Sequence, residues 1–476
     1  MLELDGGHLG IEHVEAVATR DLPVRLVGSA RARIQASHEY AVEVATRRRI
    51  YGRSTGVGAN RDVEVVDPAA QAALALSLLR SHASSSGELR TSDRVRAMLV
   101  VRLNQLAADG NGVDPAVAEG LVSMLNAGAL PPVRERGSIG TGDLSALATT
   151  ALVLGGEVAP SAPLDGTVRF GAGDALAFLS SNAAAIGDAA LAVAALRRLS
   201  RALLVVAAVG FHAVRGNPEA FAPAVEVATP FPGAREVCRV MRALVEPPSE
   251  PARIQDPFGL RTLPQVHGAL VDRLDEAEKV VVAMANAASE NPAVSAANGV
   301  AHHGGFHAVY LAQALDALVL ATAQSAQLCL ARTTMLAEPG ITGQPAFLGD
   351  GTAGASGTMV VEYAAASALA ELRALATPAG LQGVTLSRGV EDDASFASLA
   401  ARQALDAVAP YRALVAAELL TALRCLRMQG ARPASLEPVL LHVEGLGSDI
   451  RDRDLTEDLL LAERLVETMP ELPARQ

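Results

Sequence analysis

The sequence predicts a mainly α-helical protein with a small mixed part near the N-terminus, and three observations support this. Half of the 476 residues are hydrophobic, only 3% are aromatic and tryptophan is absent. Cores must therefore be built from Ala, Leu and Val, a composition that favours closely packed helices. Apolar residues recur every three or four positions along most of the chain, whereas the alternation typical of strands is scarce. We expect one continuous domain, in which a mixed part (1–200) leads into a long helical bundle (201–476).

Four segments carry the helical repeat most clearly. Residues 93–107, 266–288 and 411–428 each place Leu, Val or Met at i, i+3 or i+4 and i+7, and so predict amphipathic helices. The segment from 307 to about 336 is apolar nearly all round, which is typical of a helix with neighbours on every side. The best candidate for a strand is GTVRFG (166–171), which would make a short hairpin strand.

Loops are predicted where Gly, Pro and Ser gather, because these residues favour turns. There is no internal repeat of fixed period, and no long linker divides the chain. The predicted loops are 52–62, 131–143, 247–264, 298–305 and 338–357.

Charge and cysteine content exclude several classes of protein. A formal net charge of -12 argues against nucleic acid as a partner, since phosphate binding needs a basic face. Cys238, Cys329 and Cys425 lie far apart with no CxxC pair, so we expect buried free thiols in a reducing compartment. The first residues lack a basic segment followed by an apolar run, and the apolar segment 311–331 is interrupted by Gln and Asp. We therefore expect a soluble cytoplasmic protein without a signal peptide or membrane partner.

The predicted loops contain several motifs of one known family. IYGRSTGVG (50–58) is similar to YGxNTGFG, and IQDPFGLRTLPQVHGAL (254–270) is similar to QDxYSLRxxPQVxGA. LVSMLNAGALPPVRERGSIG (121–140) resembles the segment that leads to that family's cofactor loop. These motifs, in this order, resemble the aromatic amino acid lyases, the family of the histidine and phenylalanine ammonia-lyases. The resemblance implies their fold, a fumarase/aspartase-type helical bundle, and their homotetramer, in which each active site takes loops from three subunits.

The cofactor of that family is where this sequence departs from the pattern. Family members cyclise an internal Ala-Ser-Gly into an electrophilic methylidene-imidazolone (MIO), which drives the loss of ammonia. Their loop reads GSVGASGDLAPLAH, whereas this chain has GSIGTGDL (137–144), which is one residue shorter. Thr141 stands where the dehydrating Ser would be, and a ring from Thr would leave a more hindered, methyl-substituted alkene. We therefore interpret Gly140, Thr141, Gly142 and Asp143 as a degenerate cofactor loop and expect no cofactor.

The positions that serve the MIO in the family have changed as well. Ser180-Ser181-Asn182 stands in place of Asn-Gly-Thr, Phe258 in place of the second tyrosine, and Val390 in place of a glutamine. A literal Ala355-Ser356-Gly357 lies more than 200 residues downstream of the loop, where the family has no cofactor. The sequence thus differs from the family at several separate positions that all serve the MIO.

The substrate side of the family's site is retained. Tyr51 aligns with the general base that removes the substrate's β-proton. Arg261 aligns with the arginine whose planar fork grips the substrate carboxylate. His82 and Glu391 follow the histidine branch, in which the histidine contacts the imidazole. The resemblance thus implies Tyr51 and Glu391 as catalytic residues, together with a substrate-binding set: His82, Arg261, Gln255, Ser180, Asn182 and Phe258.

Structural roles are the alternative for each of these residues. Arg261 could neutralise Asp256, His82 could cap a helix end, and Glu391 could pair with Arg388. Two further motifs carry little weight: a GxGxxG at 349–354 without a βαβ context, and three histidines, His302, His303 and His307, in a glycine-broken loop. We expect no metal.

Three hypotheses follow from this pattern. The first is an enzyme without MIO that uses Tyr51 as a base on a carboxylate-bearing substrate, in an elimination, addition, isomerisation or cyclisation. The second is a true ammonia-lyase with an atypical Gly-Thr-Gly cofactor, and the third is a non-catalytic binding or regulatory homologue. Loss confined to the electrophile side favours the first hypothesis.

Overall fold

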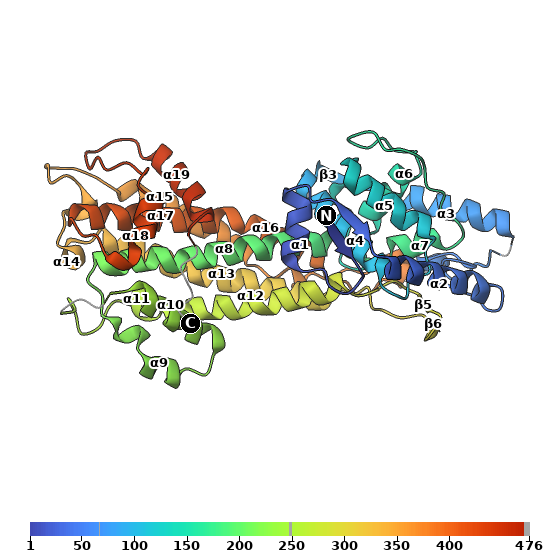
Figure 1. Ribbon diagram of the computed structural model, residues 1–476, viewed down its shortest axis with the longest axis horizontal. Coiled ribbons are helices and arrows are strands. Elements are labelled where there is room, and N and C mark those ends of the chain that lie inside the picture. The colour runs from blue at the N-terminus through green and yellow to red at the C-terminus, as the bar shows by residue number, and fades with distance from the viewer. Residues whose placement is uncertain (66, 247–249, 471–476) are drawn as a thin grey trace. The chain divides into compact units, whose positions relative to one another are not determined.

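The computed structural model describes residues 1–65, 67–246 and 250–470 (Figure 1). Helices hold 60% of the residues and strands 5%, so the prediction of a mainly helical protein is confirmed. The chain divides into two compact units, and three of the five boundaries between them fall inside long helices, α8 (Ala183–Ala213), α12 (Leu263–Ala285) and α13 (Val309–Leu336). The first unit comprises Met1–Ala194, Ala277–Asp316 and Pro378–Leu405, and the second Ala195–Glu276, Ala317–Thr377 and Asp406–Gln476.

The first unit is built around one buried helix, α4, in which every residue from Val95 to Ala107 is buried. Its neighbours include α1 and α5. The helices of this unit, besides parts of the long ones, are α1 (Ile11–Thr19), α2 (Gly28–Ala45), α3 (Pro68–His82), α4 (Ser92–Ala107), α5 (Pro115–Ala127), α6 (Leu144–Leu154), α7 (Asp174–Leu179) and α16 (Ala397–Asp406), with short 3₁₀ turns at Gly58–Asn60, Ala379–Leu381 and Ser387–Gly389.

Local sequence sets the ends of these helices, as α5 illustrates. The Asp114 carboxylate accepts a 2.8 Å hydrogen bond from the Ala116 backbone nitrogen, and Pro115 occupies the first helical position. The helix ends at Gly128, whose φ of 65° is left-handed. Such a cap suits Gly because it has no Cβ to clash there.

Three pairs of short strands complete the first unit. The pairs are β1 (Leu2–Leu4) parallel to β2 (Val24–Leu26), β3 (Ser86–Leu89) antiparallel to β4 (Arg134–Arg136), and β5 (Ala293–Ser295) antiparallel to β6 (Gly299–Ala301). Four of the six strands lie before residue 137, in the predicted mixed part.

The described residues of the second unit form helices joined by loops, with no strand among them. Its longest own helix, α17, packs against α15 and α19. Besides the long helices, this unit contains α9 (Pro223–Ala228), α10 (Pro232–Leu244), α11 (Phe258–Arg261), α14 (Pro339–Thr342), α15 (Met359–Leu375), α17 (Val408–Met428), α18 (Glu437–His442) and α19 (Thr456–Glu467), with 3₁₀ turns at Pro218–Phe221, Ala346–Leu348 and Ala434–Leu436.

All four predicted helices form, but the prediction that the 307–336 helix is covered on every side is wrong. Along α13 one stripe stays exposed, with Tyr310 at 76% and Leu320 at 50% exposure. Gln313, Gln324 and Gln327 share this stripe, so the helix is amphipathic rather than apolar all round. Among the described residues α13 alone is long and apolar enough to span a membrane, and half of its most apolar window is buried inside the protein.

The predicted strand at 166–171 is also wrong. This segment is irregular, and the Val168 backbone nitrogen donates a 2.8 Å hydrogen bond to the Leu154 carbonyl at the end of α6. The last carbonyls of a helix lack partners within it, so a passing backbone N–H satisfies one of them instead of pairing in a sheet. The predicted loops lie mostly between the longer elements, although short elements form within all five of them. Residues 247–249 of the predicted 247–264 loop lie outside the described residues.

Candidate active site

A cavity of about 970 Å³ lies in the first unit. Segments far apart in the sequence form its walls: the turn after α2, the end of α3, the loop before α6, the end of α7 and two loops around 302–307 and 387–393. The predicted site residues that line it are Tyr51, His82, Thr141, Ser180 and Glu391, together with Val390.

Tyr51 lies in a tight turn in this wall. Gly52 after it has a φ of 72°, and a Cβ there would lie 2.1 Å from a Leu176 methyl carbon, so only glycine fits. The Tyr51 hydroxyl oxygen accepts a 2.7 Å hydrogen bond from the Gly58 backbone nitrogen. Burial nevertheless raises the pKa of Tyr51, and the negative charge of Glu391 adds to this, while the Gly58 hydrogen bond and Arg61 oppose it. In this single chain Tyr51 is therefore a protonated phenol at neutral pH.

His82 both ends a helix and faces the cavity. Its Nδ1 lies 3.0 Å from the Leu78 carbonyl oxygen, one turn back in α3. The Ser81 hydroxyl lies at the same distance from Nδ1, and in the tautomer in which Nδ1 donates to Leu78 the other ring nitrogen, Nε2, is a hydrogen-bond acceptor. His82 therefore both caps the end of α3 and lines the cavity.

The loop that carries Val390 and Glu391 is closed by its own backbone. Leu386 and Glu391 exchange backbone hydrogen bonds of 2.8 and 3.3 Å across the 3₁₀ turn between them. Two residues of the turn, Ser387 and Arg388, have positive φ values of 51° and 58°, a strained conformation for side-chain-bearing residues. Glu391 makes no ion pair with Arg388 or any other described residue. Its carboxylate is therefore available to the cavity.

The 137–143 loop is held by residues 395–398 around the start of α16 and by Ala308 just before α13. The carbonyl of Ser138 accepts from the Ser398 hydroxyl at 3.0 Å, and that of Ile139 accepts from the Phe396 nitrogen at 2.8 Å. Gly140 is held twice, by the Ser395 hydroxyl at 2.8 Å and the Ala308 nitrogen at 3.2 Å. These contacts leave Thr141 as the loop residue that faces the cavity with its side chain.

Gly140 has no room for a larger residue. Its φ is 86°, and an added Cβ would lie 2.2 Å from the Ser395 hydroxyl oxygen and 2.7 and 2.8 Å from the backbone nitrogens of Ala397 and Phe396. Backbone atoms cannot swing aside as a side-chain end can. An alanine, with which the family's triad begins, therefore does not fit this position as the loop is folded.

Asn182 and Asp143 lie buried behind the loop rather than in the cavity wall. The Asn182 side-chain oxygen accepts from the Gly142 nitrogen at 3.1 Å, and its amide donates to the Phe306 carbonyl. Asp143 accepts from the Ala185 nitrogen at 2.8 Å, and burial raises the pKa of its carboxyl. Both residues fix the loop, and the prediction that Asn182 lines the substrate site is not met by the cavity wall of the single chain.

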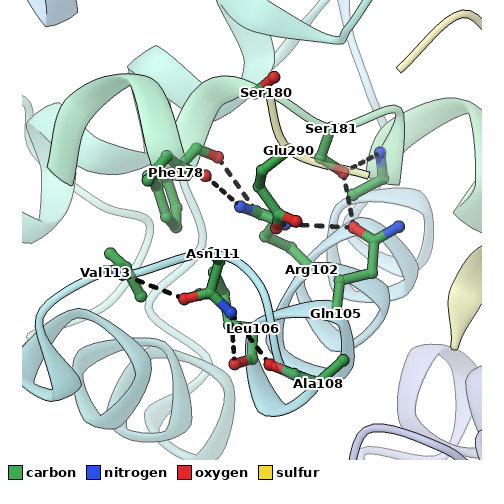
Figure 2. A network of polar contacts seen from close by, with 12 residues as sticks. Arg102, Gln105, Leu106, Ala108, Asn111, Val113, Phe178, Ser180, Ser181 and Glu290 are labelled. Atoms are coloured by element: carbon green, nitrogen blue, oxygen red, sulfur yellow. Dashed lines mark hydrogen bonds and ion pairs between the residues drawn. The ribbon is translucent and has the colours of Figure 1, made fainter. Parts of the chain in front are cut away.

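A buried polar network around Arg102, Gln105, Ser181 and Glu290 lies beside Ser180 (Figure 2). Arg102 donates to the carbonyls of Ala177 and Phe178 at the end of α7, where a cation satisfies otherwise unpaired groups. Its third contact is a 2.6 Å ion pair with Glu290, in which both side chains are at most 1% exposed. The next residue, Asn291, donates its backbone N–H to the Ser180 hydroxyl at 3.0 Å. Through these contacts the buried network holds Ser180 and Asn291, which both line the cavity, in place.

Sequence reasoning missed several charged or polar residues of the cavity. His307 lies 3.4 Å from Asp393, and the Tyr51 nitrogen donates to His302 at 3.2 Å. The cluster of histidines at 302–307 was the signal in the sequence that could have located these residues. It was considered only as a metal site, and not as part of a cavity wall. Among the described residues no group of His, Cys, Asp or Glu has the arrangement to hold a metal ion. Arg61, Asp62 and Asp392 also line the cavity.

The family model for aromatic amino acid lyases matches residues 9–443. The chain belongs to the aromatic amino acid lyase family. A histidine ammonia-lyase from Gloeobacter violaceus is 34% identical, over 98% of this chain and 95% of the relative. One from Treponema denticola is 32% identical, over 97% and 96%.

Solved structures of lyases and aminomutases share the fold. The histidine ammonia-lyase of Trypanosoma cruzi superposes with a TM-score of 0.90 at 26% identity, covering 98% of this chain and 93% of its own. The tyrosine aminomutase of Streptomyces globisporus has the same TM-score and identity, covering 98% and 97%. The ergothioneine-degrading enzyme of Treponema denticola also has a TM-score of 0.90, at 22% identity and 98% coverage of both chains, and shows the fold alone.

The remaining predicted residues of this lyase-family chain, Gln255, Phe258 and Arg261, belong to the second unit, and the cavity is lined by residues of the first unit only. Arg261 donates to the Gln255 side-chain oxygen at 2.8 Å, and its guanidinium lies 4.5 Å from the centre of the Phe258 ring. The alternative that Arg261 neutralises Asp256 is wrong, because Arg253 pairs with Asp256 at 2.8 Å. Arg261 therefore lies against the exposed ring of Phe258.

The Ala355-Ser356-Gly357 triad makes ordinary loop contacts in the second unit. The backbone nitrogens of Ser356 and Gly357 each donate to the Asp452 carboxylate at 2.8 Å. Asp452 is fully exposed, and these two hydrogen bonds lower its pKa. The triad therefore serves as an anchor for a surface loop.

Proposed function

We propose that this lyase-family chain is an enzyme that works without MIO and uses Tyr51 as the base on a carboxylate-bearing substrate. The observation that carries the proposal is the contrast between the two sides of the cavity. Tyr51, His82 and Glu391 face it together, whereas the loop that carries the family's cofactor is shortened and tightly anchored.

The geometry of the loop supports the absence of the cofactor. The family's triad needs an alanine, a serine and a glycine in a strained turn, and the ring forms when the glycine nitrogen attacks the alanine carbonyl. Here that carbonyl would belong to Gly140, whose oxygen is held by two hydrogen bonds, from the Ser395 hydroxyl and the Ala308 nitrogen. The nitrogen would belong to Gly142 and is hydrogen-bonded to Asn182. The residues present do not fit the group, so no step is assigned to it.

The chemistry then falls to the substrate and the cavity. Tyr51, once ionised, takes a proton from a carbon of the substrate, and the electron pair left on that carbon enters a conjugated system that the substrate itself contains. In an elimination the pair forms the new double bond as the leaving group departs. His82 presents a lone pair on Nε2 to a ring N–H of the substrate, and Glu391 can accept a further proton.

The carboxylate anchor of this proposal includes Arg261. Because Arg261 belongs to the second unit and does not line the cavity, the proposal assigns it to a neighbouring copy in a homotetramer. The exposed stripe of α13 and the exposed Phe258 are surfaces that such an assembly would cover.

The cofactor proposal is tested by mass. Trypsin cleaves after Arg136 and next after Arg169, so a single peptide contains the whole loop. Cyclisation followed by dehydration removes two water molecules, so we expect the unmodified mass of residues 137–169. A peptide lighter by two waters would show the Gly-Thr-Gly ring and return an ordinary ammonia-lyase as the leading function.

The role of Tyr51 is tested by substitution once a substrate is found by screening imidazole- and phenyl-bearing acids. We expect Y51F to lower kcat by at least about 100-fold with little change in substrate affinity, because general-base catalysis contributes about 10²–10⁴-fold. Unchanged turnover in Y51F excludes Tyr51 as the base. Tight binding without any turnover in the wild type would favour the non-catalytic homologue.

A further inference from the structure

Two arginines line the cavity among the described residues, and their surroundings differ. Arg49 is engaged: its guanidinium lies 2.7 Å from the Glu64 carboxylate and donates to the Asp62 carbonyl at 3.4 Å. Arg61 is loosely placed, since its nearest carboxylate oxygen, on Asp62, is 3.9 Å away. No hydrogen bond from the Arg61 side chain to another described residue is present. Its donors are therefore free to meet a ligand.

The rest of the cavity wall does not favour an anion. Glu391, Asp392 and Asp393 follow one another along the 387–393 loop, which contacts the segment that carries Gly58, and their only ionic neighbour in the described chain is His307, 3.4 Å from Asp393. His302 is neutral at pH 7, because burial and the nearby Arg48 lower its pKa. A substrate carboxylate is thus repelled by these side chains and by Asp62, and Arg61 is the lining arginine whose donors have no close partner among the described residues.

We propose that Arg61 binds the substrate carboxylate from within the same chain, as a specificity-determining residue of the cavity. The planar guanidinium presents paired N–H donors that match the two oxygens of a carboxylate. Arg61 lies in the turn that also carries Tyr51 and Gly58, so a carboxylate held there places the adjoining carbons beside the phenol. The inference rests on the proposed function for the nature of the ligand, and it adds an anchor that does not depend on Arg261.

Tyr51 provides an internal reporter of this binding. The positive charge of Arg61 favours the ionised phenol, so a carboxylate that neutralises Arg61 makes Tyr51 harder to ionise. The chain has five tyrosines and no tryptophan, so the difference in ultraviolet absorbance between the wild type and Y51F isolates the ionisation of one residue.

The test measures binding rather than turnover. The probe is 3-(imidazol-4-yl)propanoate, a carboxylate without an amino group, titrated into the full-length protein by calorimetry at pH 7. We expect R61Q to weaken binding by about 10- to 100-fold, as for loss of a charge-assisted hydrogen bond. R61K should recover part of this loss, because charge returns without the fork. R47Q is the matched control: it removes the same charge from an exposed arginine that pairs with Glu43 outside the cavity, and binding should stay within about threefold.

The outcomes separate this inference from the proposed function. Binding that depends on Arg61 but survives in Y51F supports the anchor even if no turnover is ever found. The anchor is overturned if the wild type does not bind the probe, if R61Q binds as the wild type does, or if R47Q loses as much affinity as R61Q. In the absorbance titration, the probe should raise the pKa of Tyr51 in the wild type and leave it unchanged in R61Q.

Discussion

The Gly58 backbone N–H donates a 2.7 Å hydrogen bond to the hydroxyl oxygen of Tyr51, seven residues earlier in the same turn. This donor stabilises the ionised phenol, because an oxyanion accepts hydrogen bonds more strongly than a hydroxyl does. Burial and the unpaired Glu391 act in the opposite direction and prevail, which raises the pKa of Tyr51. The pKa of Tyr51, the proposed base, is thus set by groups that act in opposite directions.

Titration of Tyr51 should show this balance. The difference in phenolate absorbance between the wild type and Y51F should give a pKa above the ordinary value of 10.0. E391Q should lower it, because a neutral amide removes the negative charge that opposes ionisation. The proposed rate should accordingly rise with pH into the alkaline range, since the ionised phenol is the active form. A lower pKa in the wild type than in free tyrosine would contradict this account.

Gly140 should tolerate no side chain. G140A combines a left-handed φ with contacts of 2.7 and 2.8 Å to two backbone nitrogens. We expect a loss of about 2–5 kcal/mol in the free energy of unfolding, measured with urea. G166A is the control, since Gly166 has a φ of 76° but open space around it, and it should cost about 1–2 kcal/mol from strain alone. Equal losses in the two variants would show that the loop is not tightly packed.

The fold could be predicted because its main signal is local. Apolar spacing alone located α4, α12, α13 and α17 to within a few residues, since a helix forms its hydrogen bonds within its own segment. The strand predicted at 166–171 failed because a strand needs a partner that the segment does not specify. The burial of α13 was overestimated because Gln313, Gln324 and Gln327 are spaced to form one polar stripe, which a count of apolar residues overlooks.

The site could be predicted only as far as motifs extend. The loop motifs identified Tyr51, His82 and Glu391, which line one cavity although they are separated by up to 340 residues. Arg61 belongs to no distinctive motif. We infer its role as a carboxylate anchor because Arg49 pairs closely with Glu64, whereas Arg61 has no such close carboxylate partner. Such pairing depends on three-dimensional surroundings, so it could not be predicted from one sequence.

Protonation of His267 should weaken the second unit in acid. His267 is fully buried, with Ser325 at 2.8 Å from Nδ1 and Ser200 at 3.0 Å from Nε2, and burial lowers its pKa to about 3. The unfolded chain binds this proton near pH 6.5 and the folded protein only near pH 3, so stability falls as pH falls through this window. The slope approaches about 1.4 kcal/mol per pH unit. Urea unfolding from pH 7 to pH 4 should show H267Q to be less pH-dependent than the wild type by this amount, and parallel curves would contradict it.

Arg332 and Glu418 should be costly to separate and easy to replace together. Both are completely buried, and the guanidinium makes two hydrogen bonds of 2.6 and 2.7 Å to the carboxylate and a third, of 3.0 Å, to the Gly259 carbonyl in α11. R332M leaves a buried carboxylate without its cation, so we expect a loss of about 3–5 kcal/mol in the free energy of unfolding. R332M/E418L removes both charges, and desolvation of the pair no longer opposes folding, so its stability should return to within about 2 kcal/mol of the wild type. R432M, which removes one partner of the exposed Arg432–Glu437 pair, should leave the unfolding midpoint nearly unchanged. A double variant no more stable than R332M would mean that shape and the Gly259 contact, rather than charge pairing, account for the retention of this buried pair.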